Sequence, residues 1–259
     1  MVVGFMIEIT SNKNKIITHI RKLESSSYRK KTGEFIIEGE RLVNDAAANG
    51  VTLCLLVVSN SYKGSIPSCD NVYKLTDKLF DEIKLTVNSQ GILAVCRMFD
   101  LDFEESFLSK DFLVYLDGIQ DPGNMGTIIR TCDAAGVGGI ILSPYCADVF
   151  NPKVVRSTMA SLFNVDMAVC DKEILHTLKE NGFTVYATSL NESISYYDGD
   201  FTGKTVIVIG NEANGVRDEV LKLSDYNIKI PMVGKAESLN AAVATGITLY
   251  EVLRQRRDK

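Results

Sequence analysis

Val206-Ile-Val-Ile-Gly210-Asn-Glu-Ala-Asn-Gly215 joins an uninterrupted apolar run to a polar loop with a glycine at each end. Four consecutive apolar side chains predict a strand buried on both faces, which is typical of a parallel sheet covered by helices. The loop offers one carboxylate, Glu212, and two amides, between glycines that let the backbone bend and approach a ligand. We therefore expect a site at the end of this strand.

A second strand end follows a short way along the chain, in Asn227-Ile-Lys-Ile-Pro231-Met232. The apolar pattern predicts a strand that ends at proline, because proline cannot donate to a sheet ladder. Ser238-Leu-Asn240 then predicts the start of the last helix, with Ser238 as its N-cap. Ligands of open parallel sheets bind beyond the carboxyl ends of the strands, so we expect the site where these two strands end.

The last helix is expected to run from Ser238 to about Arg254 and to carry an apolar stripe that includes small residues. Such a stripe packs either on the protein's own core or on a second copy of the chain, and the sequence leaves both open. The stripe consists of Leu239, Ala242, Val243, Gly246, Ile247, Tyr250 and Leu253.

The chain is long and apolar enough for one large domain or two, with 259 residues of which 46% are hydrophobic. An acidic segment divides it, so we expect a domain at 1–98, a linker at 99–110 and a second domain at 111–259. Strands alternate with helical patterns in both parts, which predicts α/β folds and a largely parallel sheet in the second. The expected elements are strands at 33–39 and 51–59 with a helix at 40–49 between them, then strands at 112–117, 139–143, 166–170, 184–188 and 205–209.

The first strand of the second domain leads into a loop rich in turn-forming residues, Asp117-Gly-Ile-Gln-Asp121-Pro-Gly-Asn124, and then into a helix that carries Arg130. Arg130 is either a surface arginine or a guanidinium fork that meets an anion, and the loop below it favours the second interpretation. The loop lacks the lysine of a P-loop, and no GxGxxG follows a strand, so nucleoside triphosphates and dinucleotides are disfavoured.

Charge is unevenly distributed along the chain, whose net charge is −5. Residues 1–98 hold 13 Lys+Arg and 10 Asp+Glu, and the remainder holds 15 and 23. The most basic window, residues 10–33, predicts an amphipathic helix with a cationic outer face, and His19 on it is expected to be structural. That face is either simply solvated or binds RNA phosphates, and Arg29, Lys30 and Lys31 are the candidate contacts.

Several other classes of site are disfavoured. The two histidines, His19 and His176, lie far apart and form no metal-binding pattern, so we expect no metal. The six cysteines include no CxxC pair and several lie in apolar runs, so they are expected to be buried free thiols. The start of the chain does not look like a signal peptide, and no apolar run has membrane length, so we expect a soluble, cytoplasmic protein.

Three motifs, in order, resemble those of the SpoU family of RNA 2′-O-ribose methyltransferases. They are Asp121-Pro-Gly-Asn124-Met-Gly126-Thr-Ile-Ile-Arg130, Val208-Ile-Gly210-Asn-Glu212-Ala-Asn-Gly215, and Ile230-Pro-Met232 with Ser238-Leu-Asn240. The resemblance spans residues 112–259, and Asn151-Pro-Lys-Val-Val-Arg156-Ser is also similar to the family. Residues 1–98 resemble, more loosely, the L30e-like substrate-binding domain often fused in front. Met125 and Ser161 stand where the family commonly has leucine and glycine.

The resemblance implies a deep trefoil knot, a homodimer, and S-adenosylmethionine bound in a bent form among the knot loops. Periodicity would not have suggested a knot, since knotted chains are rare. The cofactor-binding residues it implies are Gly210, Ile230 and Leu239, largely through backbone atoms, with Thr188, Met232 and Ser238 nearby. The catalytic residues it implies are Asn124, Arg130, Glu212 and Asn240, and Arg29, Lys30, Lys31 and Arg156 are the expected RNA contacts.

The function so predicted is methyl transfer from S-adenosylmethionine to a ribose 2′-hydroxyl of a structured RNA, with 23S-type ribosomal RNA favoured. Transfer RNA is the alternative substrate, and a non-catalytic RNA-binding protein is the alternative class. Arginine is effectively always protonated, so we expect Arg130 to bind a phosphate and stabilise developing negative charge. Glu212 is expected to orient its loop or to accept a hydrogen bond.

Overall fold

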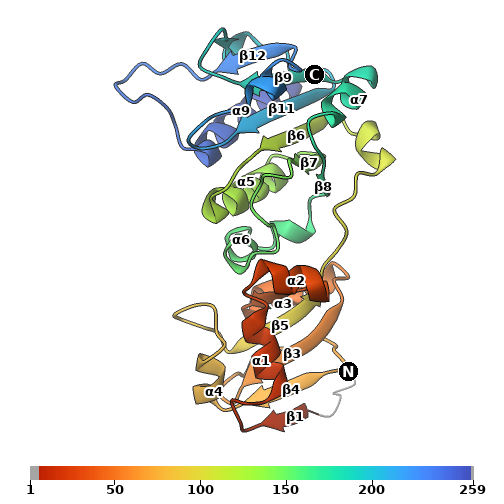
Figure 1. Ribbon diagram of the computed structural model, residues 1–259, viewed down its shortest axis with the longest axis vertical. Coiled ribbons are helices and arrows are strands. Elements are labelled where there is room, and N and C mark those ends of the chain that lie inside the picture. Colours follow the sequence, from red (N-terminus) through yellow and green to blue (C-terminus); the bar gives the residue numbers. More distant parts are fainter. Residues whose placement is uncertain (1–5, 258–259) are drawn as a thin grey trace. The chain divides into compact units, whose positions relative to one another are not determined.

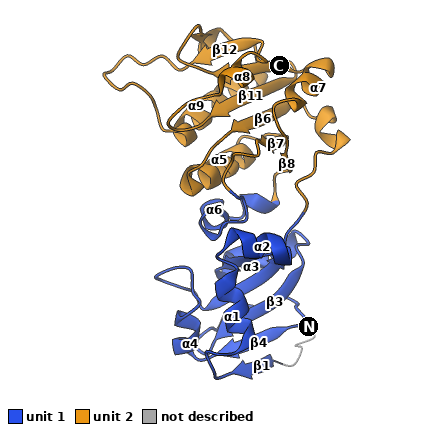
Figure 2. Cartoon of the chain, in the orientation of Figure 1, with its two compact units in different colours: residues 1–99, 148–163 blue, residues 100–147, 164–259 orange. Residues whose placement is uncertain are grey.

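The computed structural model describes residues 6–257, and the chain divides into two compact units (Figures 1 and 2). Unit 1 comprises residues 1–99 together with 148–163, and unit 2 comprises 100–147 and 164–259. The unit boundary near residue 99 lies close to the boundary expected from the sequence. Residues 148–163 belong to unit 1, although they lie within the part of the chain that carries the SpoU resemblance.

Unit 1 is built on a five-stranded mixed sheet in the order β1-β4-β3-β5-β2. β5 pairs antiparallel with β2 and β3, and the other pairs are parallel. The basic window forms two helices instead of one, because the chain turns at Leu23–Ser25 before α2 begins. The strands are β1 (Met6–Ile9), β2 (Glu34–Glu38), β3 (Leu53–Ser59), β4 (Val72–Leu75) and β5 (Ile92–Arg97), and the helices are α1 (Lys15–Lys22), α2 (Ser26–Thr32), α3 (Glu40–Ala48) and α4 (Asp77–Asp81).

Arg29 does not lie on the RNA-facing surface expected from the sequence. Its residue is 1% exposed, and its Nη1 donates to the carbonyl oxygens of Leu23 (2.9 Å) and Glu24 (2.8 Å). Its Nη2 forms an ion pair of 2.5 Å with Asp148. A buried guanidinium needs such partners, since an unpaired buried charge is costly. The prediction that Arg29 contacts RNA is therefore wrong.

Residues 148–163 pack within unit 1 through aromatic and polar contacts. The ring of Phe150, which is fully buried, lies 5.0 Å from that of Phe35 and 4.9 Å from that of Phe99. Nη1 of Arg156 donates to the carbonyl of Leu85 at 3.1 Å. The segment contains α6 (Pro152–Ser157) and the short 3₁₀ helix η2 (Ser161–Phe163).

Unit 2 is built on a seven-stranded sheet in the order β10-β12-β9-β11-β6-β7-β8, and every pair in it is parallel. This confirms the parallel α/β architecture. The strands are β6 (Phe112–Asp117), β7 (Gly139–Leu142), β8 (Met167–Val169), β9 (Thr184–Thr188), β10 (Ile194–Ser195), β11 (Thr205–Gly210) and β12 (Tyr226–Lys229). The helices are α5 (Pro122–Ala134), α7 (Ile174–Glu180), α8 (Asp218–Leu221) and α9 (Ala241–Arg257), with 3₁₀ turns η1 (Glu105–Ser109) and η3 (Tyr196–Asp198).

The central strands β6 and β11 are buried along their whole length, as the apolar runs predict. On one face of the sheet, Leu113, Tyr115, Val206 and Val208 pack in a core to which α7 and α8 also contribute. Helix α9 contacts β11, and it runs beside α5 (Figure 1). Successive strand residues point to opposite faces of the sheet, so helices can pack in a layer on each face.

The acidic segment expected to be a linker is packed on unit 2. Phe107 in η1 is 3% exposed and belongs to the core, and the amide of Val169 donates to the carbonyl of Leu101 at 2.7 Å. This acidic stretch thus also contains apolar residues that fix it to unit 2.

The last helix begins later than expected. Oδ1 of Asn240 accepts hydrogen bonds from the amides of Ala242 (3.0 Å) and Val243 (3.3 Å), so Asn240 and not Ser238 caps α9. The apolar stripe is partly buried in the single chain, since Ala242 is buried whereas Val243 and Tyr250 are 51% and 52% exposed. The buried positions are Ala241, Ala242, Thr245, Thr248, Leu249, Glu251 and Val252.

Within residues 6–257, none of the helices is long and apolar enough to cross a membrane, and there is no group of side chains that could hold a metal ion. The six cysteines are free, as expected, but only Cys96 and Cys132 are buried, and the other four are partly exposed. His19 accepts or donates a hydrogen bond with Tyr28 at 3.0 Å and lies 3.0 Å from Glu34, which fits the structural role predicted for it.

Candidate active site

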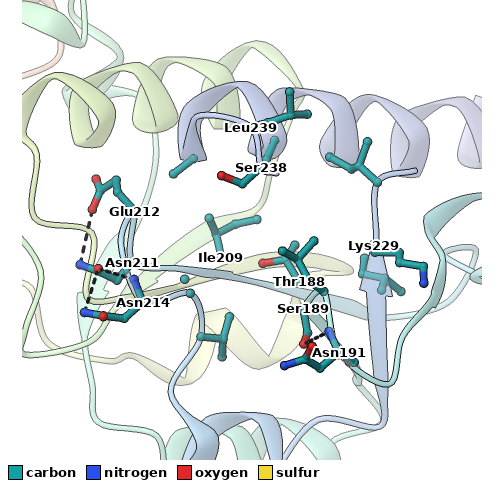
Figure 3. Close-up of a pocket in the computed structure, with 18 of the residues that line it drawn as sticks. Thr188, Ser189, Asn191, Ile209, Asn211, Glu212, Asn214, Lys229, Ser238 and Leu239 are labelled. Carbon is teal, nitrogen blue, oxygen red and sulfur yellow. Dashed lines mark hydrogen bonds between the residues drawn. The ribbon is translucent and has the colours of Figure 1, made fainter. Parts of the chain in front are cut away.

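A cavity of about 430 Å³ opens at the carboxyl ends of β9, β11 and β12 (Figure 3). This is the edge of the sheet at which the sequence predicts a site, and the volume is typical of small-molecule pockets. Figure 3 shows Thr188 and Ser189 on one side of Ile209 and the backbone carrying Ser238 and Leu239 on the other. All six residues expected to bind the cofactor line the cavity: Thr188, Gly210, Ile230, Met232, Ser238 and Leu239.

Gly210 lies where the loop after β11 folds back on itself. A Cβ atom at this position would lie 2.1 Å from the amide nitrogen of Val216 and 2.2 Å from the carbonyl carbon of Gly215. These neighbours are backbone atoms that cannot rotate away. Glycine is therefore required at 210, a buried position that lines the cavity.

Asn211 makes the loop after β11 rigid. Its backbone exchanges two hydrogen bonds of 2.9 Å with Gly215, which close the loop as a small bridge. Its side-chain Oδ1 accepts from the amides of Ala213 (2.9 Å) and Asn214 (3.1 Å), and its Nδ2 donates to the carbonyl of Gly118 at 2.7 Å. Asn211 thus gives the loop internal bonds and also bonds it to the loop after β6.

Glu212 connects this loop to the start of α5. Its carboxylate accepts hydrogen bonds from the amides of Gln120 (3.4 Å) and Asp121 (3.3 Å) and from Nδ2 of Asn124 (3.0 Å). The N-terminus of a helix favours negative charge, which explains why a carboxylate is placed there. This geometry suits the orienting role predicted for Glu212.

Asn124 and Asn240 complete a chain of side chains. Nδ2 of Asn240 donates to Oδ1 of Asn124 at 2.9 Å, while Nδ2 of Asn124 donates to Glu212. Asp121 caps α5 by accepting from the amide of Asn124 at 2.8 Å, so the helix start that carries Asn124 is itself fixed. Three of the four residues expected to be catalytic are thereby joined beside the cavity.

Arg130 is not part of this chain. It is exposed on α5, six residues after Asn124, which is about 9 Å along a helix axis. Within residues 6–257 it makes no hydrogen bond or ion pair, so its guanidinium is free to meet an anion from solvent. The structure thus joins three of the four residues predicted to be catalytic and leaves Arg130 outside that chain of hydrogen bonds.

Tyr196 lines the cavity from η3. Burial, together with a hydrogen bond to the neighbouring Tyr197, raises the pKa of Tyr196 to about 12. Its phenol is therefore neutral at physiological pH and can serve as a hydrogen-bonding group but not as a ready base.

The expected RNA contacts are all in unit 1. Lys30 and Lys31 are exposed on α2, and Arg156 is exposed on α6 with one nitrogen held by Leu85. These three positions remain available at the surface, whereas Arg29 does not.

Sequence reasoning missed the pair of Asp117 and Arg217. Asp117 ends β6 and is 1% exposed, and its two oxygens accept from the amide (2.9 Å) and Nε (2.7 Å) of Arg217. The sequence contains one indication of this pair. Asp117 is a carboxylate at the end of a fully apolar run, and a buried carboxylate needs a cationic partner. The identity of that partner, 100 positions away, could not be read from the pattern.

Two family models match the chain. One is described as the SpoU rRNA Methylase family and matches residues 111–250, and the other is described as an MRM3-like substrate binding domain and matches residues 14–94.

Individual proteins match over most of the chain. A 23S rRNA (guanosine(2553)-2′-O)-methyltransferase, RlmP, of Bacillus subtilis is 34% identical over 95% of this chain and 99% of its own length. The crystal structure of an AdoMet-bound rRNA methyltransferase from Sinorhizobium meliloti superposes with a TM-score of 0.85 at 32% identity, covering 96% of this chain and 98% of that one. A tRNA (guanosine(18)-2′-O)-methyltransferase of Aquifex aeolicus is 41% identical, over 58% of this chain and 72% of its own length.

Proposed function

The chain belongs to the SpoU rRNA methylase family, and from this premise we propose that it methylates a ribose 2′-hydroxyl of 23S-type ribosomal RNA. It is an S-adenosylmethionine-dependent RNA 2′-O-methyltransferase. One observation carries the assignment of the site. The six residues expected to bind the cofactor line one cavity, and the linked side chains of Glu212, Asn124 and Asn240 lie beside it.

The cavity has the features that S-adenosylmethionine requires. Gly210 places backbone atoms at the cavity wall, and Ile230 and Leu239 supply apolar surface. Thr188 and Ser238 add hydroxyl groups, although that of Thr188 already donates to the carbonyl of Val208 at 3.0 Å. When bound, S-adenosylmethionine supplies a methyl group made electrophilic by its sulfonium.

The protein's task is then mainly to align the ribose hydroxyl with that methyl group and to stabilise the charge that develops. The amide group of Asn124 is held by Glu212 and that of Asn240 by Asn124, so the two can orient the acceptor nucleotide without rearranging. Arg130 can bind a phosphate of the same RNA with its planar fork. A guanidinium stays protonated, so in this scheme Arg130 acts by its charge and not as a base.

The proposal of ribosomal RNA is supported by the extent of similarity. RlmP matches across both units, whereas the transfer RNA enzyme covers 58% of the chain. The N-terminal unit, which matches a substrate binding domain, is therefore shared with the ribosomal RNA enzyme. Transfer RNA remains the alternative substrate, and its support is the higher identity within the shared part.

Mapping 2′-O-methyl groups in ribosomal and transfer RNA from cells with and without the gene tests this proposal. A ribosomal RNA site that disappears on deletion and returns with the wild-type gene supports it, and loss of a transfer RNA site instead favours the alternative. Calorimetry with S-adenosylmethionine separates both from a non-catalytic RNA-binding protein, for which no binding is expected.

We also propose a homodimer and a cytoplasmic location. On α9, Val243 and Tyr250 are about half exposed in the single chain, and such apolar surface suits a second copy. Sedimentation of a dilute solution tests this, and a monomer counts against it.

The cytoplasm is where a ribosomal RNA substrate is found. The deep knot implied by the resemblance is consistent with the seven-stranded parallel sheet and stays a prediction.

A further inference from the structure

Three side chains form a layered arrangement next to the proposed acceptor site. The buried carboxylate of Asp117 holds the guanidinium of Arg217 at 2.7 Å, and Cζ of Arg217 lies 4.5 Å from the centre of the Tyr145 ring. A second contact, 2.6 Å from Nη1 to Glu219, fixes the other side of the guanidinium. The tyrosine is 54% exposed, so part of its surface faces solvent.

The backbone that carries Tyr145 is also fixed. It lies in a turn closed by a hydrogen bond of 3.1 Å from the amide of Cys146 to the carbonyl of Ser143. Ser143 accepts from the amide of Gly118 at 2.9 Å, and the amide of Ala147 donates to the carbonyl of Ile119 at 2.8 Å. Both ends of the turn are therefore bonded to the loop that follows β6. An exposed aromatic ring held by its backbone and by a cation beneath it has little freedom to lose on binding.

The ring lies next to the loops of the candidate active site. A Cβ added at Gly118 would lie 3.9 Å from Cβ of Tyr145 and 4.0 Å from Cβ of Asn211, so these three positions are neighbours. Asn211 adjoins Glu212 and contacts its carboxylate at 3.5 Å. A single exposed tyrosine is ordinary on a protein surface. This one differs because it is pre-organised and lies beside the loops that hold Glu212.

We propose that Tyr145 is a stacking platform for an unpaired nucleobase of the RNA, at or next to the nucleotide whose ribose is methylated. The inference rests on the proposed function, since it needs an RNA substrate. Proteins that read RNA at single-stranded positions commonly stack splayed bases on aromatic rings. Each such stack contributes about 1–3 kcal/mol, so its loss weakens RNA binding roughly fivefold to a hundredfold.

Kinetics with an RNA that the wild-type protein methylates provide the first test. Tyr145→Leu keeps an apolar side chain of substantial size but removes the ring face, and we expect its KM for RNA to rise about fivefold or more. Tyr145→Phe keeps the face and is expected to behave like wild type. Affinity for S-adenosylmethionine and the melting temperature should stay unchanged in both. Tyr226→Ala is the matched control, because that residue is also half exposed and also packs on a side chain, Tyr186, but lies at the start of β12, away from the cavity.

Fluorescence provides the second test, since the chain contains no tryptophan. Tyr145→Trp introduces a single reporter, and its emission should be quenched when the RNA is added without cofactor. Tyr226→Trp should show no change.

The outcomes separate the two proposals. If wild type methylates the RNA but Tyr145→Leu has the wild-type KM, or Tyr145→Trp is not quenched, the platform is wrong and the function stands. If Tyr145→Leu loses cofactor binding or melts early, the ring supports the fold and the platform is again wrong. If wild type methylates no RNA, the proposed function fails.

Discussion

Oε1 of Glu212 accepts a hydrogen bond of 3.0 Å from Nδ2 of Asn124, a residue 88 positions away in the chain. The same carboxylate accepts from the backbone amides of Gln120 and Asp121, which immediately precede α5. Glu212 is therefore a clasp between the loop after β11, which lines the cavity, and the helix that carries Asn124. These hydrogen bonds depend on the negative charge of the Glu212 carboxylate as well as on its size, because all three partners are N–H donors.

We expect Glu212→Gln to lower the rate of methyl transfer. The glutamine has one acceptor oxygen in place of two, and its NH₂ group faces donors. Hydrogen bonds to a charged group contribute about 1.5–3 kcal/mol, so a rate loss of roughly tenfold to a hundredfold is expected in single-turnover assays. Asp218→Asn is the control, since Asp218 is another carboxylate lining the same cavity, on the side of α8. Equal losses in the two variants would show that charge in the cavity, and not the clasp, matters.

Arg130→Lys should reduce kcat/KM for RNA while leaving cofactor affinity unchanged. Lysine keeps the charge but loses the planar fork that binds a phosphate through two hydrogen bonds. We expect a fall of about tenfold, measured with a methylated-product assay. Arg257→Lys, the same exchange at an exposed position near the end of α9, should have no effect. A native rate for Arg130→Lys contradicts the two-bond role.

Ala160→Gly should stabilise the protein. Met159 and Ala160 have positive φ angles of 51° and 78°, in the left-handed region. This conformation costs an L-residue about 1–2 kcal/mol, and glycine avoids that cost. We expect the free energy of unfolding to rise by about 1 kcal/mol in urea titrations. Ser161, where the family commonly has glycine, has no positive φ, so Ser161→Gly should give no gain. If Ser161→Gly raised the free energy of unfolding and Ala160→Gly did not, the strain assigned to Ala160 would be wrong.

Asp148→Asn should destabilise the protein strongly. It removes the charged partner of Arg29, whose guanidinium has no access to solvent. Breaking a buried pair by removing one partner costs about 3 kcal/mol or more. Asp45→Asn is the control. It breaks an exposed pair with Arg41 (3.5 Å), for which a change below about 0.5 kcal/mol is expected. Similar losses in the two variants would contradict the importance of burial.

Strand ends and the cavity could be predicted from the sequence because they depend on local patterns. Apolar runs ending in glycine or proline mark the ends of β11 and β12, and motif order indicates which of their residues meet the cofactor. Pairings across long separations could not be predicted in the same way. Arg29 reads as part of a basic surface until Asp148, 119 positions later, is seen to neutralise it.

The buried face of α9 could not be predicted for a different reason. Thr245 and Thr248 are fully buried, although threonine counts as polar in a periodicity argument. Their hydroxyls donate to the carbonyls of Ala241 (2.7 Å) and Ala244 (3.0 Å) within the same helix, so no polar group is left unsatisfied. Gly246 packs beside Thr131 of α5, where an added Cβ would lie at 3.7 Å. The small residue that suggested contact with another subunit thus adjoins a helix of its own chain.

Because residues 148–163 belong to unit 1, that unit consists of two pieces of the chain, separated by the first strands of unit 2. An experiment that exchanges unit 1 between relatives must therefore replace both residues 1–99 and residues 148–163. A chimaera joined only near residue 99 would pair a foreign sheet with the native Phe150 and Asp148, and the pocket for the ring and the partner for the carboxylate would both be lost. Both pieces must be exchanged together if unit 1 is to keep its own internal contacts.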